Sequence, residues 1–169
     1  MNLNMRKLFL TFTLSICACI FAFAQRAELS LDGVWKIAEG KFSKIPEEFN
    51  SEIQVPGFVD MARPAFKDVG AKTLKERGLK PHYPVDSLRE AFWYRRDFDF
   101  NLDLPQVAYI KLNKAAFSAK VYINGHFAGE HKPSYTAGYF DVKPFLKKGK
   151  NEILIAIGAS PAAMGGGTA

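Results

Sequence analysis

The chain has 169 residues and a formal net charge of +6. Its length is enough for one domain with a real core. The positive charge is scattered, apart from a cluster at Lys147, Lys148 and Lys150. Because nucleic-acid-binding proteins gather their cations in a stripe or patch, this distribution argues against a nucleic-acid partner.

The first 24 residues have the pattern of a signal peptide. Arg6 and Lys7 precede an apolar run at residues 8–23, and the small-x-small sequence AFA ends at Ala24. We therefore expect cleavage before Gln25 and export to the periplasm or the extracellular space. The apolar run is shorter than the ~20 residues of a membrane span, which predicts no stable membrane insertion.

The same segment leaves two alternatives open. One is an uncleaved membrane anchor, and the other is a lipoprotein signal, because ICAC at residues 16–19 loosely resembles a lipobox. Both cysteines, Cys17 and Cys19, lie within this segment. After cleavage before Gln25, the mature chain would contain no cysteine and therefore no disulfide. The core alone must then hold an exported domain together.

Short apolar strands separated by Gly and Pro turns follow along the mature chain. They are predicted at residues 34–37, 53–55, 92–100, 110–112, 119–123, 139–142 and 153–157. No stretch keeps a helical period, and residues 60–90 are interrupted by Gly and Pro, which indicates a long insertion between strands. The pattern predicts an all-β fold, either a sandwich or a barrel.

Three details sharpen this prediction. Residues 92–100 alternate, with Arg96 on the aromatic face, where a buried charge would need a partner. Asn124 and Gly125 form a two-residue hairpin signal, because both tolerate positive φ. Residues 153–157 are apolar on both faces and predict a central, buried strand around Ile155.

Four segments resemble one family: LDGVWKI at 31–37, IQVPGF at 53–58, FWYRRDFDF at 92–100 and the block at 121–157 that contains VYINGHFAGEH and YFDV. The chain is similar to the N-terminal sugar-binding domain of glycoside hydrolase family two, the β-galactosidase, β-glucuronidase and β-mannosidase group. The resemblance implies an antiparallel β-sandwich, a galactose-binding-like jelly roll, over residues 25–158. Residues 159–169 contain Gly and Pro in a pattern typical of loops. They predict a loop or a truncated end, so we expect a domain fragment that lacks its last strands.

The resemblance also implies where catalysis lies. Retaining glycoside hydrolysis needs two carboxyl groups about 5–5.5 Å apart, and in the family both are glutamates of a later barrel domain. None maps onto this chain, so no catalytic residue is predicted, and whether the chain itself is an enzyme is left open. Asn151-Glu152 only superficially matches the family's asparagine-glutamate pair, and Asp97, Asp99 and Asp103 are interpreted as a solvated strand face.

Cofactor and metal sites are not predicted. His126 and His131 lie five residues apart around the hairpin, and a zinc site needs three or four converging ligands. Sugar contact is the one plausible local chemistry. In the family, the loop before the tryptophan-tyrosine-arginine strand can reach the sugar pocket, which makes His82 and Tyr83 candidate substrate contacts. The alternative is an ordinary Pro-rich loop packed on the sandwich.

Two functions follow from these observations. The first is a non-catalytic sugar-binding domain of an exported glycoside hydrolase that acts on β-glycosidic bonds, with carbohydrate and the catalytic barrel as partners. The second is a stand-alone carbohydrate-binding or adhesion module. Export by a signal peptide is common to both, and the two differ in whether a catalytic barrel belongs to the same polypeptide.

Overall fold

The computed structural model describes residues 26–67, 69 and 89–159. The chain divides at residue 30 into two units. In the first unit, the described residues 26–30 have no regular structure, and Arg26 and Glu28 form an exposed ion pair at 2.7 Å. The predicted signal peptide, its cleavage site at Ala24 and Gln25, and residues 160–169 lie outside the described residues.

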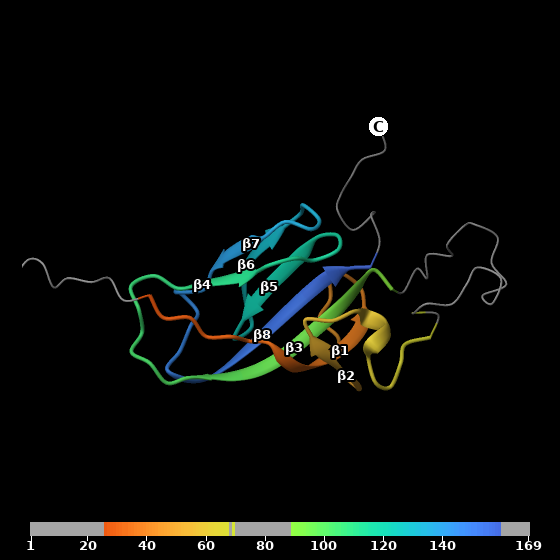
Figure 1. The fold of residues 1–169 in the computed structure, drawn as a ribbon, viewed down its shortest axis with the longest axis horizontal. Coiled ribbons are helices and arrows are strands. Elements are labelled where there is room, and N and C mark those ends of the chain that lie inside the picture. Colours follow the sequence, from red (N-terminus) through yellow and green to blue (C-terminus); the bar gives the residue numbers. More distant parts are fainter. Residues whose placement is uncertain (1–25, 68, 70–88, 160–169) are drawn as a thin grey trace, which may run out of the picture. The chain divides into compact units, whose positions relative to one another are not determined.

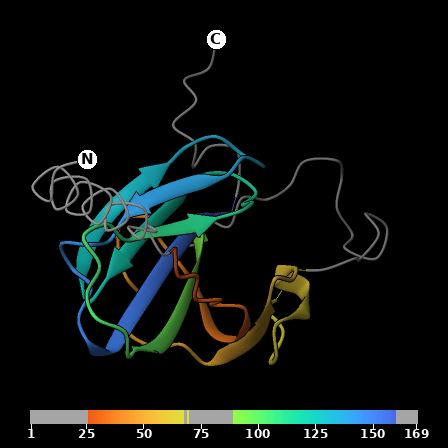
Figure 2. The same cartoon turned by 60° about the vertical axis from the view of Figure 1, so that its left-hand side comes forward.

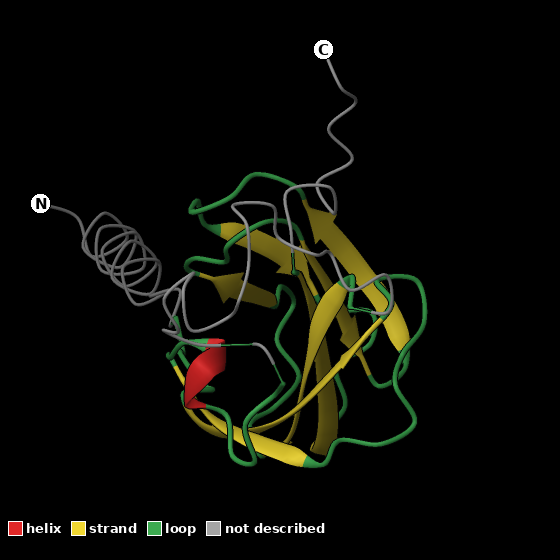
Figure 3. Cartoon of the chain, turned by 90° about the vertical axis from the view of Figure 1, so that its right-hand side faces the viewer, coloured by secondary structure: helices red, strands yellow, loops and turns green. Residues whose placement is uncertain are grey.

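The described part of the second unit is built from β-strands, all of them paired antiparallel (Figures 1 and 3). The strands are β1 Gly33–Gly40, β2 Ser51–Val55, β3 Ala91–Phe100, β4 Tyr109–Leu112, β5 Ala119–Ile123, β6 His126–His131, β7 Gly138–Asp141 and β8 Gly149–Gly158. One 3-10 turn, η1 at Val59–Met61, is the helical element among these residues, and nothing helical there has the length and hydropathy of a membrane span. The predicted all-β fold is confirmed.

Six strands form the larger sheet, in the order β2-β1-β3-β8-β5-β6, and β4 pairs with β7 in a second, two-stranded sheet. The long strands β3 and β8 lie at the centre of the larger sheet (Figures 1 and 2). β8 is central because it is apolar on both faces: Ile153, Leu154, Ile155 and Ala156 are all buried. The prediction of a buried central strand is confirmed.

The main core lies on the inner face of the larger sheet, beneath the two-stranded sheet and residues 59–69. Trp35, Ile37, Ile53, Phe92, Val121, Ile123, Ile153 and Ile155 project from the larger sheet. Phe140 of β7 is buried in the same cluster, and Ile110 and Leu112 of β4 pack against it. This packing of two antiparallel sheets confirms the predicted β-sandwich.

A segment without strands covers the rest of the inner face, over β2, β1 and β3. Ala62 is fully buried in the core, and Val59, Phe66 and Val69 pack against it. A backbone bridge joins Arg63 to Glu52 of β2, so this segment also pairs with the outermost strand on that side. The first part of the predicted insertion therefore belongs to the core and to the sheet edge.

The hairpin turn has the predicted geometry. Asn124 and Gly125 have φ values of 51° and 80°, and they join β5 to β6. The Asn124 amide group also bridges away from its own hairpin, since its nitrogen donates to the carbonyl of Phe145 and to Oδ1 of Asn151, both at 2.8 Å. Asn151 is 3% exposed, and its nitrogen donates in turn to the carbonyls of Lys147 and Gly149. The two asparagines thus fix the hairpin to the turn that leads into β8.

Candidate functional site

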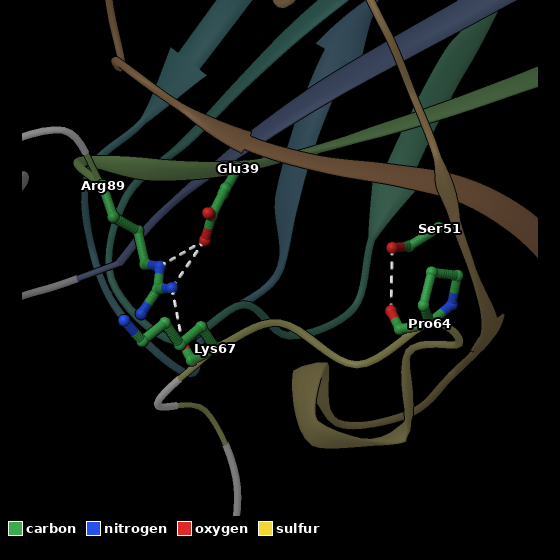
Figure 4. A network of polar contacts seen from close by, with 5 residues as sticks. All are labelled: Glu39, Ser51, Pro64, Lys67 and Arg89. Atoms are coloured by element: carbon green, nitrogen blue, oxygen red, sulfur yellow. Dashed lines mark hydrogen bonds and ion pairs between the residues drawn. The ribbon is translucent and has the colours of Figure 1, made fainter.

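The candidate site predicted from the sequence is the insertion that precedes β3, and its two ends are tied together by one arginine. Arg89 donates from Nε to Oε2 of Glu39 on β1 at 2.6 Å, and from Nη2 to the carbonyl of Lys67 at 2.7 Å (Figure 4). Lys67 precedes residues 70–88 and Arg89 follows them. This contact therefore brings residues 67 and 89 close together in space, although they are 22 residues apart in the sequence.

Packing and a second hydrogen bond reinforce this anchor. The guanidinium of Arg89 lies 5.7 Å from the ring centroid of Phe92, which in turn contacts Phe66 with centroids 5.3 Å apart. Ser51 Oγ donates to the carbonyl of Pro64 at 2.8 Å (Figure 4). The cation-π contact adds to hydrogen bonds that are otherwise accessible to solvent. Together these contacts hold residues 66, 67 and 89 beside the start of β3.

The predicted sugar contacts themselves, His82 and Tyr83, lie outside the described residues, so their role remains a prediction. Nothing in the sequence singled out Arg89 as their anchor. The signal that could have identified Arg89 is a positive charge at the end of the insertion. It would have to be combined with knowledge of Glu39, the partner of Arg89 50 residues earlier. That pairing follows from the β1–β3 register, which places Glu39 opposite Phe92.

Arg96 has the partners that its place on the aromatic face required. Its Nη1 donates to the carbonyls of Leu31 at 3.0 Å and Asp32 at 2.8 Å, and the guanidinium lies 6.0 Å from the Trp35 ring centroid. Gly33 makes room for this contact, because a Cβ there would lie 2.9 Å from Nη1 of Arg96. Arg96 therefore holds the start of β1 in place, which is a structural role.

The histidines and acidic residues do not converge. His126 stacks on Phe145 with centroids 5.0 Å apart, while Nε2 of His131 lies 2.9 Å from Thr136 Oγ1. Within the described ranges, no group of three His, Cys, Asp or Glu side chains could hold a metal ion. Asp97, Asp99 and Asp103 are exposed, as predicted for a solvated face.

The side chains of Asn151 and Glu152 contact different parts of the fold. Asn151 closes the turn before β8, whereas Glu152 forms an ion pair with Arg95 at 2.5 Å. The Glu152 backbone N–H donates to Asn124 Oδ1 at 3.0 Å, and this bond belongs to the same turn. This pair therefore has a structural function in the described fold.

The outer face of the larger sheet holds a second apolar cluster that sequence reasoning missed. Trp93 is 1% exposed although it points away from the main core, and it packs with Ala91 and Ala156. Phe42 and Phe49, from the connection between β1 and β2, cover this cluster. The indole Nε1 of Trp93 donates to the carbonyl of Lys41 at 2.9 Å, which fixes the connection over the sheet.

Aromatic rings continue from this cluster toward the sheet edge. Tyr122 lies 5.8 Å from Trp93 and 5.3 Å from Phe127 between ring centroids, and Phe127 is 51% exposed. Burial, and secondly the charge of Glu130, raise the pKa of the Tyr122 hydroxyl. Lys120 Nζ lies 4.3 Å from the Phe42 ring centroid, within the range of a cation-π contact. This face can offer both aromatic surface and hydrogen-bonding groups.

Comparisons with known proteins agree with this architecture. Residues 82–165 match the family model described as the glycosyl hydrolase 2 galactose-binding domain-like family. The chain is 31% identical over 114 residues to a β-galactosidase of Thermoanaerobacter pseudethanolicus, a match that covers 67% of this chain. It spans 15% of that relative's length.

Solved structures show the same fold. A β-D-mannosidase from Dictyoglomus thermophilum matches with 25% identity and a TM-score of 0.51, over 76% of this chain and 15% of that one. A β-glucuronidase from Ruminococcus gnavus matches with 20% identity and a TM-score of 0.54, over 80% of this chain and 23% of that one. The chain therefore belongs to the galactose-binding-like domain family found in the N-terminal part of family-two glycoside hydrolases.

Proposed function

We propose that this chain is a non-catalytic, sugar-binding domain of an exported glycoside hydrolase that acts on β-glycosidic bonds. One observation carries the proposal: the chain matches the galactose-binding-like domain and spans 15% of the length of a β-galactosidase. The names of the similar proteins, β-galactosidase, β-mannosidase and β-glucuronidase, support β-glycosides as the substrate class. The partner of this domain is then the catalytic barrel of the same enzyme.

The contacts of the described carboxylates support a non-catalytic role. Retaining hydrolysis needs an acid/base and a nucleophile held about 5–5.5 Å apart. Here Glu39 is bound by Arg89, Glu152 by Arg95 and Asp103 by Lys148. These groups support the fold.

The anchored insertion supports a role in shaping the sugar cleft. Arg89 holds residue 67 beside residue 89, so the two ends of the insertion predicted from the sequence lie together. His82 and Tyr83 would then contact substrate held mainly by the barrel, because aromatic and imidazole rings combine an apolar face with polar atoms. Rigid support from a packed sheet is what a substrate-positioning loop needs.

Export is the remaining part of the proposal. The charged, apolar and small-x-small regions before Gln25 support cleavage after Ala24 and delivery to the periplasm or the extracellular space. The N-terminal sequence of the native protein tests this: we expect it to begin at Gln25. A start at Cys17 or Cys19 would point to the lipoprotein pathway, and an intact N-terminus would contradict export by cleavage.

The non-catalytic role is tested by incubating the full chain with nitrophenyl β-galactoside, β-glucuronide and β-mannoside. We expect no release of nitrophenol above background. Release that disappears when a single Asp or Glu is changed would contradict the proposal.

An immunoblot of the source cells with an antibody against residues 26–67 tests the link to a barrel. The recognised polypeptide should be several times longer than 169 residues.

A further inference from the structure

One row of side chains crosses the whole outer face of the six-stranded sheet. The residues of this row are directly opposite one another in the register, from the β2 edge to the β6 edge: Glu52, Lys36, Arg95, Leu154, Tyr122 and Phe127. Five steps between neighbouring strands of about 4.8 Å give the row a length of roughly 24 Å. We call these six residues the outer row.

The two halves of the outer row differ in chemistry. Tyr122 and Phe127 form the aromatic half, and their ring centroids lie 5.3 Å apart. Glu52, Lys36 and Arg95 form the charged half, which borders a depression of about 400 Å³. Leu154, 6% exposed, lies between the halves. Accessible aromatic rings beside a depression lined by polar groups are the usual character of a small-molecule or glycan site.

The flanks of the outer row are fixed. On one side, the connection between β1 and β2 holds Phe42 and Phe49 over the neighbouring row, where Trp93 and Ala156 are buried. Arg95 is held from two directions: its guanidinium lies 5.8 Å from the Phe49 ring centroid, and it pairs with Glu152 at 2.5 Å. A guanidinium held in place in this way loses little conformational entropy when it donates a further hydrogen bond.

The charged half of the row contains both signs, with Lys36 and Arg95 positive and Glu52 negative. Lys36 lies directly opposite both Glu52 and Arg95, and Asp97 borders the same depression. Lys36, Glu52 and Asp97 are exposed, and the described residues provide none of them with an ion-pair partner. Such a surface has hydrogen-bond donors and acceptors side by side, which suits an uncharged ligand rich in hydroxyl groups, since each hydroxyl group can both donate and accept.

We propose that the outer row binds an extended, uncharged oligosaccharide that lies across the strands of the larger sheet. The apolar C–H faces of its sugars stack on Tyr122 and Phe127, and hydroxyl groups further along exchange hydrogen bonds with Arg95, Lys36 and Glu52. This binding surface goes beyond the proposed function, because it includes neither His82 nor Tyr83 and requires no catalytic barrel. Its consequence is that the domain holds a polymeric glycan as well as supporting a cleft.

Calorimetric titration of the full chain with uncharged β-1,4-linked hexasaccharides of glucose, xylose, mannose and galactose tests the proposal. We expect at least one hexasaccharide to bind, and its disaccharide to bind at least tenfold more weakly. Phe127→Ala should weaken hexasaccharide binding at least tenfold. Lys36→Ala, four strands away at the charged end, should weaken binding of the same hexasaccharide severalfold, because one ligand spans both residues. Unfolding curves of both variants should match the original, since both side chains are exposed.

Tyr139→Ala is the matched control. Tyr139 is 64% exposed on β7, and Phe127 is 51% exposed. Tyr139→Ala therefore removes an accessible aromatic ring from the other sheet, and binding should stay unchanged. Failure of all four hexasaccharides to bind would overturn the proposal, as would an equal loss from Tyr139→Ala. A dimer that dissociates when Phe127 is replaced would show that a second copy occupies the row, and would also overturn it. None of these results affects the hydrolysis test of the proposed function.

Discussion

The two faces of the six-stranded sheet are built on the same strands, yet they carry different kinds of surface. The inner face is a continuous apolar core in which Ile37, Ile123 and Ile153 are fully buried. The outer face has one small buried cluster around Trp93, and beside it the half-exposed outer row. Because successive residues of a strand point to opposite faces, each strand contributes to stability on one side and can contribute to recognition on the other. The difference teaches that alternation along a strand separates the two faces, and that burial then separates the Trp93 cluster from the outer row on the outer face.

The largest effect should come from placing a charge on the inner face. Ile155→Asp should lower the free energy of unfolding by about 5 kcal/mol, because it buries an unpaired carboxylate in the core. That is most of the stability of an ordinary domain. Phe127→Asp, on the outer face, is the control and should change little. Urea unfolding of both proteins checks this, and similar midpoints would contradict the contrast between the faces.

Trp93→Ala tests the buried part of the outer face. Removing an indole that is 1% exposed should cost about 3–5 kcal/mol, through the cavity and the lost hydrogen bond to the Lys41 carbonyl. Trp93→Phe should cost less, since it keeps most of the packing. If Trp93→Ala melts like the original protein, Phe42 and Phe49 do not cover this cluster in solution.

Alkaline pH probes the inner face through Tyr94. Burial raises the pKa of Tyr94 from 10.0 to about 12. Its folded-state pKa is raised, so its contribution is fully present below pH 10 and is lost as pH rises toward 12. The loss should amount to about 3 kcal/mol between pH 10 and 12. Tyr94→Phe should remove this part of the alkaline loss, so the stability difference between the two proteins should change between pH 10 and 12. A constant difference would contradict the burial of the hydroxyl.

A smaller effect concerns the turn that joins β5 to β6. Gly125 has a φ of 80°, and no heavy atom lies within 4 Å of where its Cβ would be. Gly125→Val should therefore cost about 1–2 kcal/mol from backbone strain alone. Gly125→Asn is the matched control and should cost less, since asparagine tolerates this conformation. Equal unfolding free energies for the two variants would mean that the turn does not need positive φ.

The features that the sequence predicted share a short-range signal. Alternation at residues 92–100, the Asn124-Gly125 turn and the doubly apolar strand around Ile155 are all readable within ten residues. The features that it missed depend on distant partners. Phe42 and Phe49 lie in a connection whose apolar residues follow no regular period. Only the folded sheet places them over Trp93. Arg89 reaches Glu39 across 50 residues, and the second role of Asn124 depends on Asn151.

The division of labour between the two faces is tested most directly by measuring stability and glycan affinity side by side in two variants. Ile37→Val, on the inner face, should lower the free energy of unfolding by about 0.5–1.5 kcal/mol and leave hexasaccharide affinity unchanged. Phe127→Ala, on the outer face, should weaken hexasaccharide binding at least tenfold and leave the unfolding midpoint unchanged. If both quantities fall together in both variants, the two faces do not act separately, and the account of this domain is contradicted.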